Sequence, residues 1–267
     1  METPHLSWAA LLERAVTEPG IISSAYSQFH SYSIGNQLLA WAQCAQRGIP
    51  LGPMATFVRW KDLGRHVKRG EKALTLCQPV TIKRKTESEA ASTDRAEAEI
   101  LIRFVYRPHW FVLSQTDGQQ LSPTEIPSWD QARAFAALSV SEAPFDCSDG
   151  NVMGYARKRE VSVSPLNPLP HKTLFHEVAH VLLGHTSEGE QAESEITARS
   201  LREAEAESVA MICCEALGLE GASQCRGYIQ SWWGQGNPIP ERSAQSILRV
   251  ADRILRGGRV AAERGAE

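Results

Sequence analysis

The sequence predicts an α+β protein of two domains, residues 1–125 and 126–267. Helical and strand-like patterns of apolar residues both occur, in separate segments. The length of 267 residues suits two modest domains or one large one. A short stretch with Pro123 and Pro127 is typical of a linker. It favours two domains that meet near residue 125.

The first domain is expected to contain helices packed on a small antiparallel sheet. Apolar residues recur at intervals of three and four over residues 8–16 and 32–46, which predicts two helices. Alternation of apolar and polar residues predicts strands at 56–60, 72–82 and 100–116. The segment between the last two strands is polar, low in complexity and without aromatic residues, so we expect a mobile hairpin excursion there.

The second domain is expected to begin with a helix near Ser128, whose hydroxyl can cap the first turn. One strand or a hairpin follows at residues 152–164. Residues 172–185 are helical in pattern and apolar on nearly every side, which predicts a buried helix. A last long helix covers residues 197–217 and ends at Gly218.

The overall composition excludes several classes of protein. With 28 Lys+Arg, 31 Asp+Glu and 42% hydrophobic residues, the chain is a soluble globular protein and not a collagen, a coiled coil or a disordered tail. The six cysteines form no C-x-x-C pair and the N-terminus has no secretory pattern, so we expect free thiols and a cytoplasmic location. No apolar run approaches the roughly 20 residues of a membrane span, and no membrane partner is expected.

The strongest chemical signal is the H-E-x-x-H pattern from His176 to His180. Four helical residues of about 100° each bring the two imidazoles within about 40° of one another on one helix face. One Zn²⁺, or another divalent ion, can therefore bind both histidines. Glu177 lies beside this face, where a carboxylate can take a proton from a water molecule at the metal. We predict that Glu177 is the catalytic general base.

A catalytic zinc needs a third protein ligand. His185 is turned about 140° from His180 and is expected at the helix end. Glu203 and Glu207 are four residues apart on the last long helix, so they share a face. One of them would bind the metal, and the other would accept the outer N–H of a ligand histidine. Spacing leaves both assignments open. The order in thermolysin-like enzymes, ligand first and orienting acid four residues later, favours Glu203 as ligand.

The glutamate between these two is expected to have no metal role. Glu205 is turned about 160° to 200° from both neighbours on the helix, so we predict that it lies on a solvated face.

A second signal is the basic strip, which we define as residues 57–72. It holds six basic side chains against two acidic ones, and Phe57, Trp60 and His66 lie among them. Cations for phosphates and flat rings for bases are what single-stranded DNA binding requires. The predicted DNA-binding residues are Arg59, Trp60, Lys61, Arg65, Lys68, Arg69 and Lys72. A charged strand and loop with a buried tryptophan explains the pattern equally well. Strand alternation predicts that only one of the two large rings faces DNA.

Several of these segments together resemble the ArdC family of plasmid antirestriction proteins. In the first domain the resemblance rests on YSIGNQLLAW, TFVRWKDLGRHVKRGEKAL and FVLSQTDGQQL, at residues 32–41, 56–74 and 111–121. In the second it rests on TLFHEVAHVLLGH and EAEAESVA, at residues 173–185 and 203–210. The second pair is also similar to peptidases of the ImmA/IrrE type. Glu207 stands where those relatives usually have Asp or Asn.

The resemblance implies an N-terminal single-stranded DNA-binding domain and a C-terminal zincin-like metallopeptidase domain. The metal ligands that it implies are His176, His180 and Glu203, with Glu207 in an orienting role. The expected function is antirestriction, with single-stranded DNA as partner and a protein or peptide as possible substrate. The alternative is a regulatory metalloprotease of the ImmA/IrrE kind that cleaves a repressor or another protein. A binding protein with a structural metal is a third interpretation.

Overall fold

The computed structural model describes residues 7–84, 99–122, 125–186, 199–234 and 236–260. Helices and small, mainly antiparallel sheets make up the described parts, which confirms the predicted α+β class. The chain forms two compact units. The smaller unit is residues 43–120, and the larger unit combines residues 1–42 with residues 121–267. The predicted hairpin excursion falls mostly outside the described residues.

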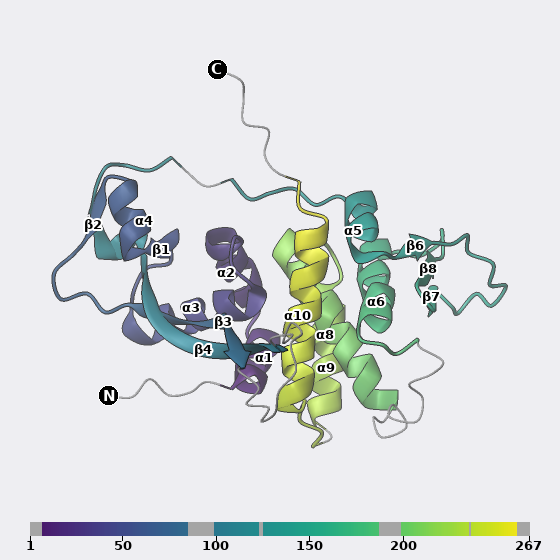
Figure 1. Cartoon of the computed structure of the whole chain (residues 1–267). Helices are drawn as coiled ribbons and strands as arrows, with labels where there is room; N and C mark the ends of the chain where they lie inside the picture. The colour runs from purple at the N-terminus through teal and green to yellow at the C-terminus, as the bar shows by residue number, and fades with distance from the viewer. Residues whose placement is uncertain (1–6, 85–98, 123–124, 187–198, 235, 261–267) are drawn as a thin grey trace, which may run out of the picture. The chain divides into compact units, whose positions relative to one another are not determined.

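The smaller unit is built on a long two-stranded ribbon, visible in Figure 1 as β3 and β4. In this ribbon Cys77 pairs with Tyr106 and Pro79 with Phe104. β1 extends the sheet on the other side of β4, and β2 pairs with β5 in a second small sheet. The elements of the unit are β1 (Met54–Thr56), α4 (Phe57–Asp62), β2 (Arg65–Val67), β3 (Leu74–Arg84), β4 (Glu99–Val112), η1 (Leu113–Gln115) and β5 (Thr116–Gly118).

The prediction of a strand at residues 56–60 is wrong, because the helix α4 begins at Phe57. The Thr56 hydroxyl accepts a hydrogen bond from the backbone N–H of Arg59 and so caps α4. The helix turns Trp60 into the core, where its Nε1 donates to the Phe111 carbonyl at 2.8 Å. Five alternating residues are too few to distinguish a strand from one turn of helix, and the threonine cap decides for the helix.

Helices dominate the larger unit. Its first helices are α1 (Trp8–Thr17), α2 (Ile21–Phe29) and α3 (Ile34–Arg47), the last of which continues into the smaller unit. α2 was not predicted. The later helices are α5 (Gln131–Leu138), α6 (Pro170–Leu182), α8 (Arg199–Leu217), α9 (Ala222–Gly234) and α10 (Glu241–Gly257). α8 packs against α6, α9 and α10 and is buried along most of its length.

A small sheet flanks α6. Its strands are β6 (Ser141–Glu142), β7 (Gly154–Arg157) and β8 (Glu160–Val163), in the order β6-β8-β7. β7 and β8 form the predicted hairpin, and both contact α6. Gly154 permits this close approach, because a Cβ at that position would lie 2.5 Å from Thr173 Cγ2. The hairpin therefore lies directly against the helix that carries the H-E-x-x-H pattern.

Residues 7–42 pack with the C-terminal helices, which differs from the predicted division at residue 125. The Glu241 carboxylate accepts the backbone N–H groups of Trp8 and Ala9, each at 2.9 Å. The Arg226 guanidinium donates to the Ala15 carbonyl at 2.7 Å. Local sequence patterns carry no information on such long-range pairs. The assignment of DNA binding to residues 1–125 and of peptidase chemistry to 126–267 remains a prediction.

Three smaller expectations have clear outcomes. α5 begins at Gln131 and not near Ser128, because the Asp130 carboxylate caps it by accepting the Arg133 N–H at 2.7 Å. All six cysteines are free, as predicted. In the described ranges, none of the helices has the length and apolar character needed to span a bilayer.

Candidate metal centre

α6 places both motif histidines on one face. The helix begins with Pro170, and its apolar residues Leu174, Phe175, Val178, Ala179 and Val181 are buried. His176 and His180 lie one turn apart, and each side chain is 14% exposed. The Nε2 atoms of the two rings are 3.0 Å apart. The predicted spacing therefore brings two imidazole nitrogens to one point inside the larger unit.

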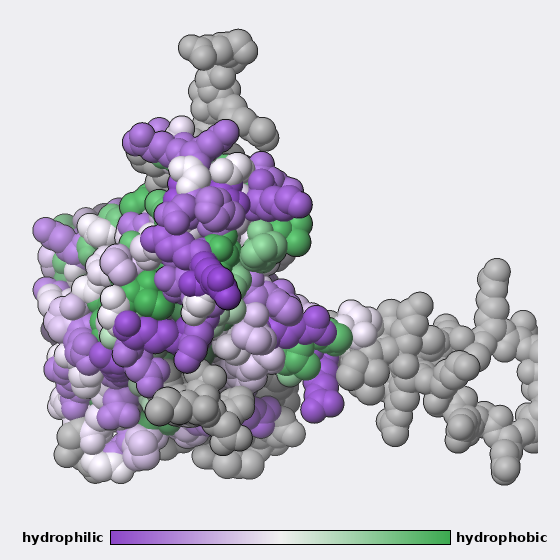
Figure 2. Space-filling view, turned by 90° about the vertical axis from the view of Figure 1, so that its left-hand side faces the viewer, coloured by the Kyte–Doolittle hydropathy of each residue, from purple (hydrophilic) through white to green (hydrophobic). Residues whose placement is uncertain are grey.

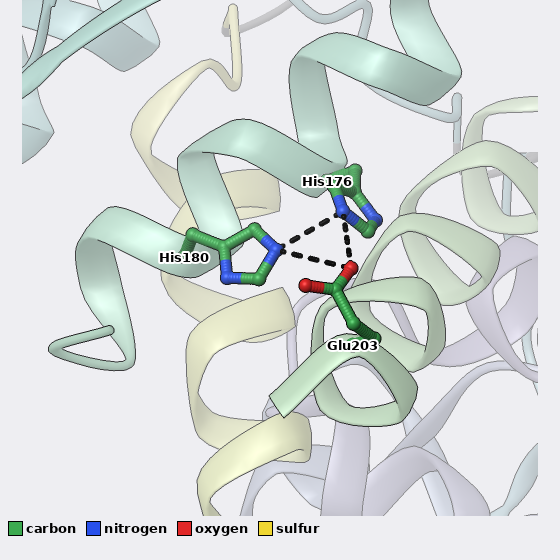
Figure 3. A group of neighbouring side chains, drawn as sticks. All are labelled: His176, His180 and Glu203. Atoms are coloured by element: carbon green, nitrogen blue, oxygen red, sulfur yellow. Dashed lines mark hydrogen bonds and ion pairs between the residues drawn. The ribbon is translucent and has the colours of Figure 1, made fainter. Parts of the chain in front are cut away.

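α8 adds a carboxylate at the same point (Figure 3). Glu203 Oε2 lies 3.4 Å from His176 Nε2 and 3.7 Å from His180 Nε2. The neighbouring imidazoles, His176 first and then His180, hold the pKa of the Glu203 carboxyl far below its usual range. Glu203 is therefore ionised. The structure brings together the three residues that were predicted as ligands.

The geometry and chemistry of this cluster fit a divalent ion. Two imidazoles and one carboxylate are a donor set that zinc uses with a fourth position open. Two nitrogens at about 2.0–2.1 Å from a tetrahedral ion are ~3.3 Å apart, so His176 and His180 need to separate only slightly. His176 Nδ1 is buried and makes no hydrogen bond, and Glu207 Oε1 faces it at 3.5 Å.

Glu177 lies next to the cluster and has no place among the three converging atoms. It is only 9% exposed. Burial raises the pKa of its carboxyl, and His176 and His180 oppose this shift. A pKa raised toward neutrality favours a group that must accept and then release a proton.

Glu207 lies behind His176, as expected for an orienting acid. Its Oε1 is 3.5 Å from His176 Nδ1 and 2.6 Å from Lys172 Nζ. The first distance is at the limit of a hydrogen bond, and the second is a close ion pair. Lys172 was missed by sequence reasoning, although its position four residues before His176 places it on the same helix face. The ion pair with Lys172 holds the Glu207 carboxylate beside the His176 ring.

Replacement of the two α8 glutamates should have unequal effects on metal affinity. Glu203→Ala removes a converging oxygen and is expected to lower affinity strongly. Glu207→Ala is expected to cost the lesser 10- to 100-fold typical of groups that orient a ligand. Titration of the metal-free variants with Zn²⁺ and Mn²⁺ measures both. A larger loss of metal affinity in Glu207→Ala than in Glu203→Ala would show that Glu207 is the ligand and Glu203 the orienting acid.

The prediction that Glu205 lies on a solvated face is wrong. Glu205 is 7% exposed, and its Oε2 lies 3.1 Å from His185 Nε2. The other nitrogen of His185, Nδ1, lies 2.9 Å from His180 Nδ1. Glu205 does lie on a different face of α8 from Glu203 and Glu207. This face does not meet solvent, because α6, α9 and α10 cover α8 on several sides. His185 lies beyond the end of α6, as expected.

The basic strip holds five exposed cations, and two of its basic side chains contact the segment around β5. Arg59, Lys61, Lys68, Arg69 and Lys72 are exposed. Arg65 donates to the Thr116 hydroxyl and carbonyl, each at 2.8 Å, and Lys68 donates to the Ser114 carbonyl at 2.9 Å. These two side chains join β2 to the segment around β5. The inclusion of Trp60 among the DNA-binding residues is wrong, because Trp60 is 1% exposed and cannot stack on a base.

Two exposed rings on β4 were not predicted. Phe104 is 65% exposed and Tyr106 is 38% exposed. They are two residues apart and so lie on one face of the strand. Arg103 and Arg107 flank them and are exposed. The signal was present as Arg-Phe-Val-Tyr-Arg within a predicted strand. Figure 2 shows one face of the molecule, on which hydrophilic residues predominate and hydrophobic residues form patches.

The comparisons with known proteins point to one family. Residues 9–111 match the family model of the N-terminal domain of anti-restriction factor ArdC. The metal-free crystal structure of antirestriction ArdC from plasmid R388 matches with a TM-score of 0.55 and 19% identity, over 94% of this chain and 97% of that chain. The chain therefore carries an ArdC-like N-terminal region, and its fold resembles that of ArdC. The Mn(II)-bound structure of the same ArdC matches with a TM-score of 0.52 and 18% identity over the same shares.

The match confirms the resemblance to ArdC that the sequence motifs predicted. At this identity the structural likeness establishes the ArdC fold, over nearly the whole of both chains. The matched family model begins within α1 and ends within β4. No curated protein matches the chain.

Proposed function

We propose that this ArdC-like protein binds single-stranded DNA, protects incoming DNA from host restriction, and carries a metallopeptidase-type centre. The antirestriction role rests on the match of residues 9–111 to the ArdC N-terminal domain. The observation that carries the enzymatic part is the convergence of His176, His180 and Glu203 beside the buried Glu177.

The residues that would hold the ion are the two histidines and Glu203. This donor set suits Zn²⁺, and the related ArdC was crystallised with Mn(II), so both ions are candidates. When bound, the ion supplies Lewis acidity toward a peptide carbonyl. Glu177 takes a proton from the attacking water and delivers it to the leaving amine nitrogen. The raised pKa of the Glu177 carboxyl is suited to both transfers.

The strand β7 offers a place for an extended peptide. It is an edge strand among the described strands, since β8 pairs with it on one side only. It also contacts α6, the helix of the motif. An edge strand can hold a peptide by backbone hydrogen bonds, which bind without requiring a particular side chain. This arrangement supports a protein or peptide substrate.

Single-stranded DNA binding is supported by the exposed groups of the smaller unit. Phe104 and Tyr106 offer flat rings at strand spacing, and Arg103 and Arg107 lie beside them in sequence. The five exposed cations of the basic strip add positive charge in the same unit. Bases in a single strand can stack on such rings, whereas bases paired in a duplex cannot reach them.

Alanine at Phe104 and at Tyr106 is expected to weaken binding of single-stranded DNA by about 1–3 kcal/mol each, because each ring stacks on one base. Fluorescence anisotropy with a labelled oligothymidine, on the full chain, measures this. Alanine at Arg69 and Lys72 should instead flatten the salt dependence, by about 0.7 in log–log slope for each phosphate that the side chain would otherwise neutralise.

The matched control is Tyr228→Ala, because Tyr228 is an aromatic residue of the larger unit that is 43% exposed. It should bind DNA as the unaltered protein does. Equal affinity for duplex and single strand in the unaltered protein would contradict the proposed DNA role.

A restriction-protection assay with Glu177→Gln separates the proposal from its alternative. Protection that survives this change is expected if DNA binding performs the antirestriction role. Loss of protection together with loss of cleavage of a protein target would favour the regulatory metalloprotease of the ImmA/IrrE kind.

A further inference from the structure

We propose that His185 and Glu205 fix His180 in the one imidazole tautomer that can bind a metal through Nε2. The inference rests on the metal centre proposed above and adds two positioning residues to it. Neither residue is one of the three converging ligands.

The contacts form a continuous line behind His180. His180 Nδ1 lies 2.9 Å from His185 Nδ1, and His185 Nε2 lies 3.1 Å from Glu205 Oε2. The side chains of His185 and Glu205 are each 10% exposed. Both nitrogens of His185 are therefore engaged inside the protein, and neither belongs to the three converging ligand atoms.

The donor and acceptor roles along this line follow from the chemistry of its groups. A carboxylate oxygen accepts hydrogen bonds, so the contact at 3.1 Å places a proton on His185 Nε2, which donates to Glu205 Oε2. A neutral imidazole with a proton on Nε2 has a lone pair on Nδ1, so His185 Nδ1 must accept. The proton in the second hydrogen bond therefore belongs to His180 Nδ1. This leaves the lone pair of His180 on Nε2, the atom that faces His176 and Glu203.

The backbone explains why His185 reaches this position. α6 ends at Leu182, and Gly184 follows with φ +83°, a left-handed conformation that favours glycine. The helix ends there, and the His185 N–H donates to the His180 carbonyl at 2.9 Å. The turn thus fixes the His185 ring over His180, and α8 supplies Glu205 from the other side.

The two ligand histidines are held differently. His176 Nδ1 faces Glu207 directly at 3.5 Å, whereas His180 reaches its carboxylate, Glu205, through a second imidazole. A carboxylate that orients a ligand histidine raises its basicity and selects its tautomer. In the proposed line, Glu205 acts on His180 only through His185. Replacement of Glu205 should therefore have no further effect on His180 once His185 has been replaced.

The experiment uses the full chain in its metal-free form with ¹⁵N-labelled histidine. The nitrogen chemical shifts of His180 report which ring nitrogen carries the proton, independently of any metal or activity. We expect His180 to be protonated on Nδ1 in the unaltered protein and to show a mixture of tautomers in His185→Leu. Affinity for Mn²⁺ and Zn²⁺ should fall about 10- to 100-fold in the same variant.

Three further variants sharpen the test. His185→Asn keeps an acceptor near the position of Nδ1 and should retain the tautomer and most of the affinity. Glu205→Ala should shift the tautomer in the same direction as His185→Leu, and the double variant should be no worse than His185→Leu, because Glu205 acts through His185. His171→Ala, at an exposed histidine of α6, should change nothing.

An unchanged His180 tautomer in His185→Leu, or effects of the two changes that add, would overturn the inference. If the unaltered protein binds no metal, the proposed centre fails, whereas the tautomer measurement still decides the role of His185. Far-UV circular dichroism on each variant separates a local change from unfolding.

Discussion

Purified protein is expected to hold about one divalent ion per chain and to lose it when either His176 or His180 is replaced by alanine. Each change removes one of three converging ligand atoms from a largely buried position. With only two ligands left, the site cannot compete with water for the ion. Elemental analysis after dialysis measures the content directly.

His171→Ala is the matched control, because His171 lies on the same helix and is exposed. It should keep the full metal content. Metal content that is unchanged in both His176→Ala and His180→Ala would refute the site.

Glu177→Gln is expected to abolish peptidase activity while the metal stays bound. The amide has nearly the shape of the carboxylate but cannot accept the proton of the attacking water. Loss of a general base costs about 10²- to 10⁴-fold in rate. Cleavage of fluorescein-labelled casein by the metal-loaded protein, with metal content measured in parallel, tests both parts.

Glu160→Gln serves as the control for the loss of one negative charge, since Glu160 is an exposed glutamate of β8 in the same unit. It should cleave at the rate of the unaltered protein. Full activity in Glu177→Gln would rule out its role as base.

The part of the site that could be predicted from sequence is the part governed by helical spacing. His176 and His180 meet because they are four residues apart, and Glu203 and Glu207 share a face for the same reason. The line from His180 through His185 to Glu205 could not be predicted. It depends on the turn at Gly184 and on which neighbours cover α8, and neither is encoded in a local pattern.

The same distinction holds for the fold. The ribbon of β3 and β4 and the two long helices α6 and α8 have extended patterns and were predicted close to their observed bounds. α4 was mistaken for a strand because a six-residue helix shows too little periodicity. The packing of α1 against α10 involves residues more than two hundred positions apart, such as Trp8 and Glu241, and only the structure reveals it.

Anomalous diffraction from crystals of the full chain grown with Mn²⁺ would locate the bound ion. We expect one strong peak within bonding distance of His176 Nε2, His180 Nε2 and the Glu203 carboxylate, with Glu177 beside it and outside the ligand set. A peak at His185 and Glu205, or full occupancy at a site that excludes Glu203, would contradict this expectation.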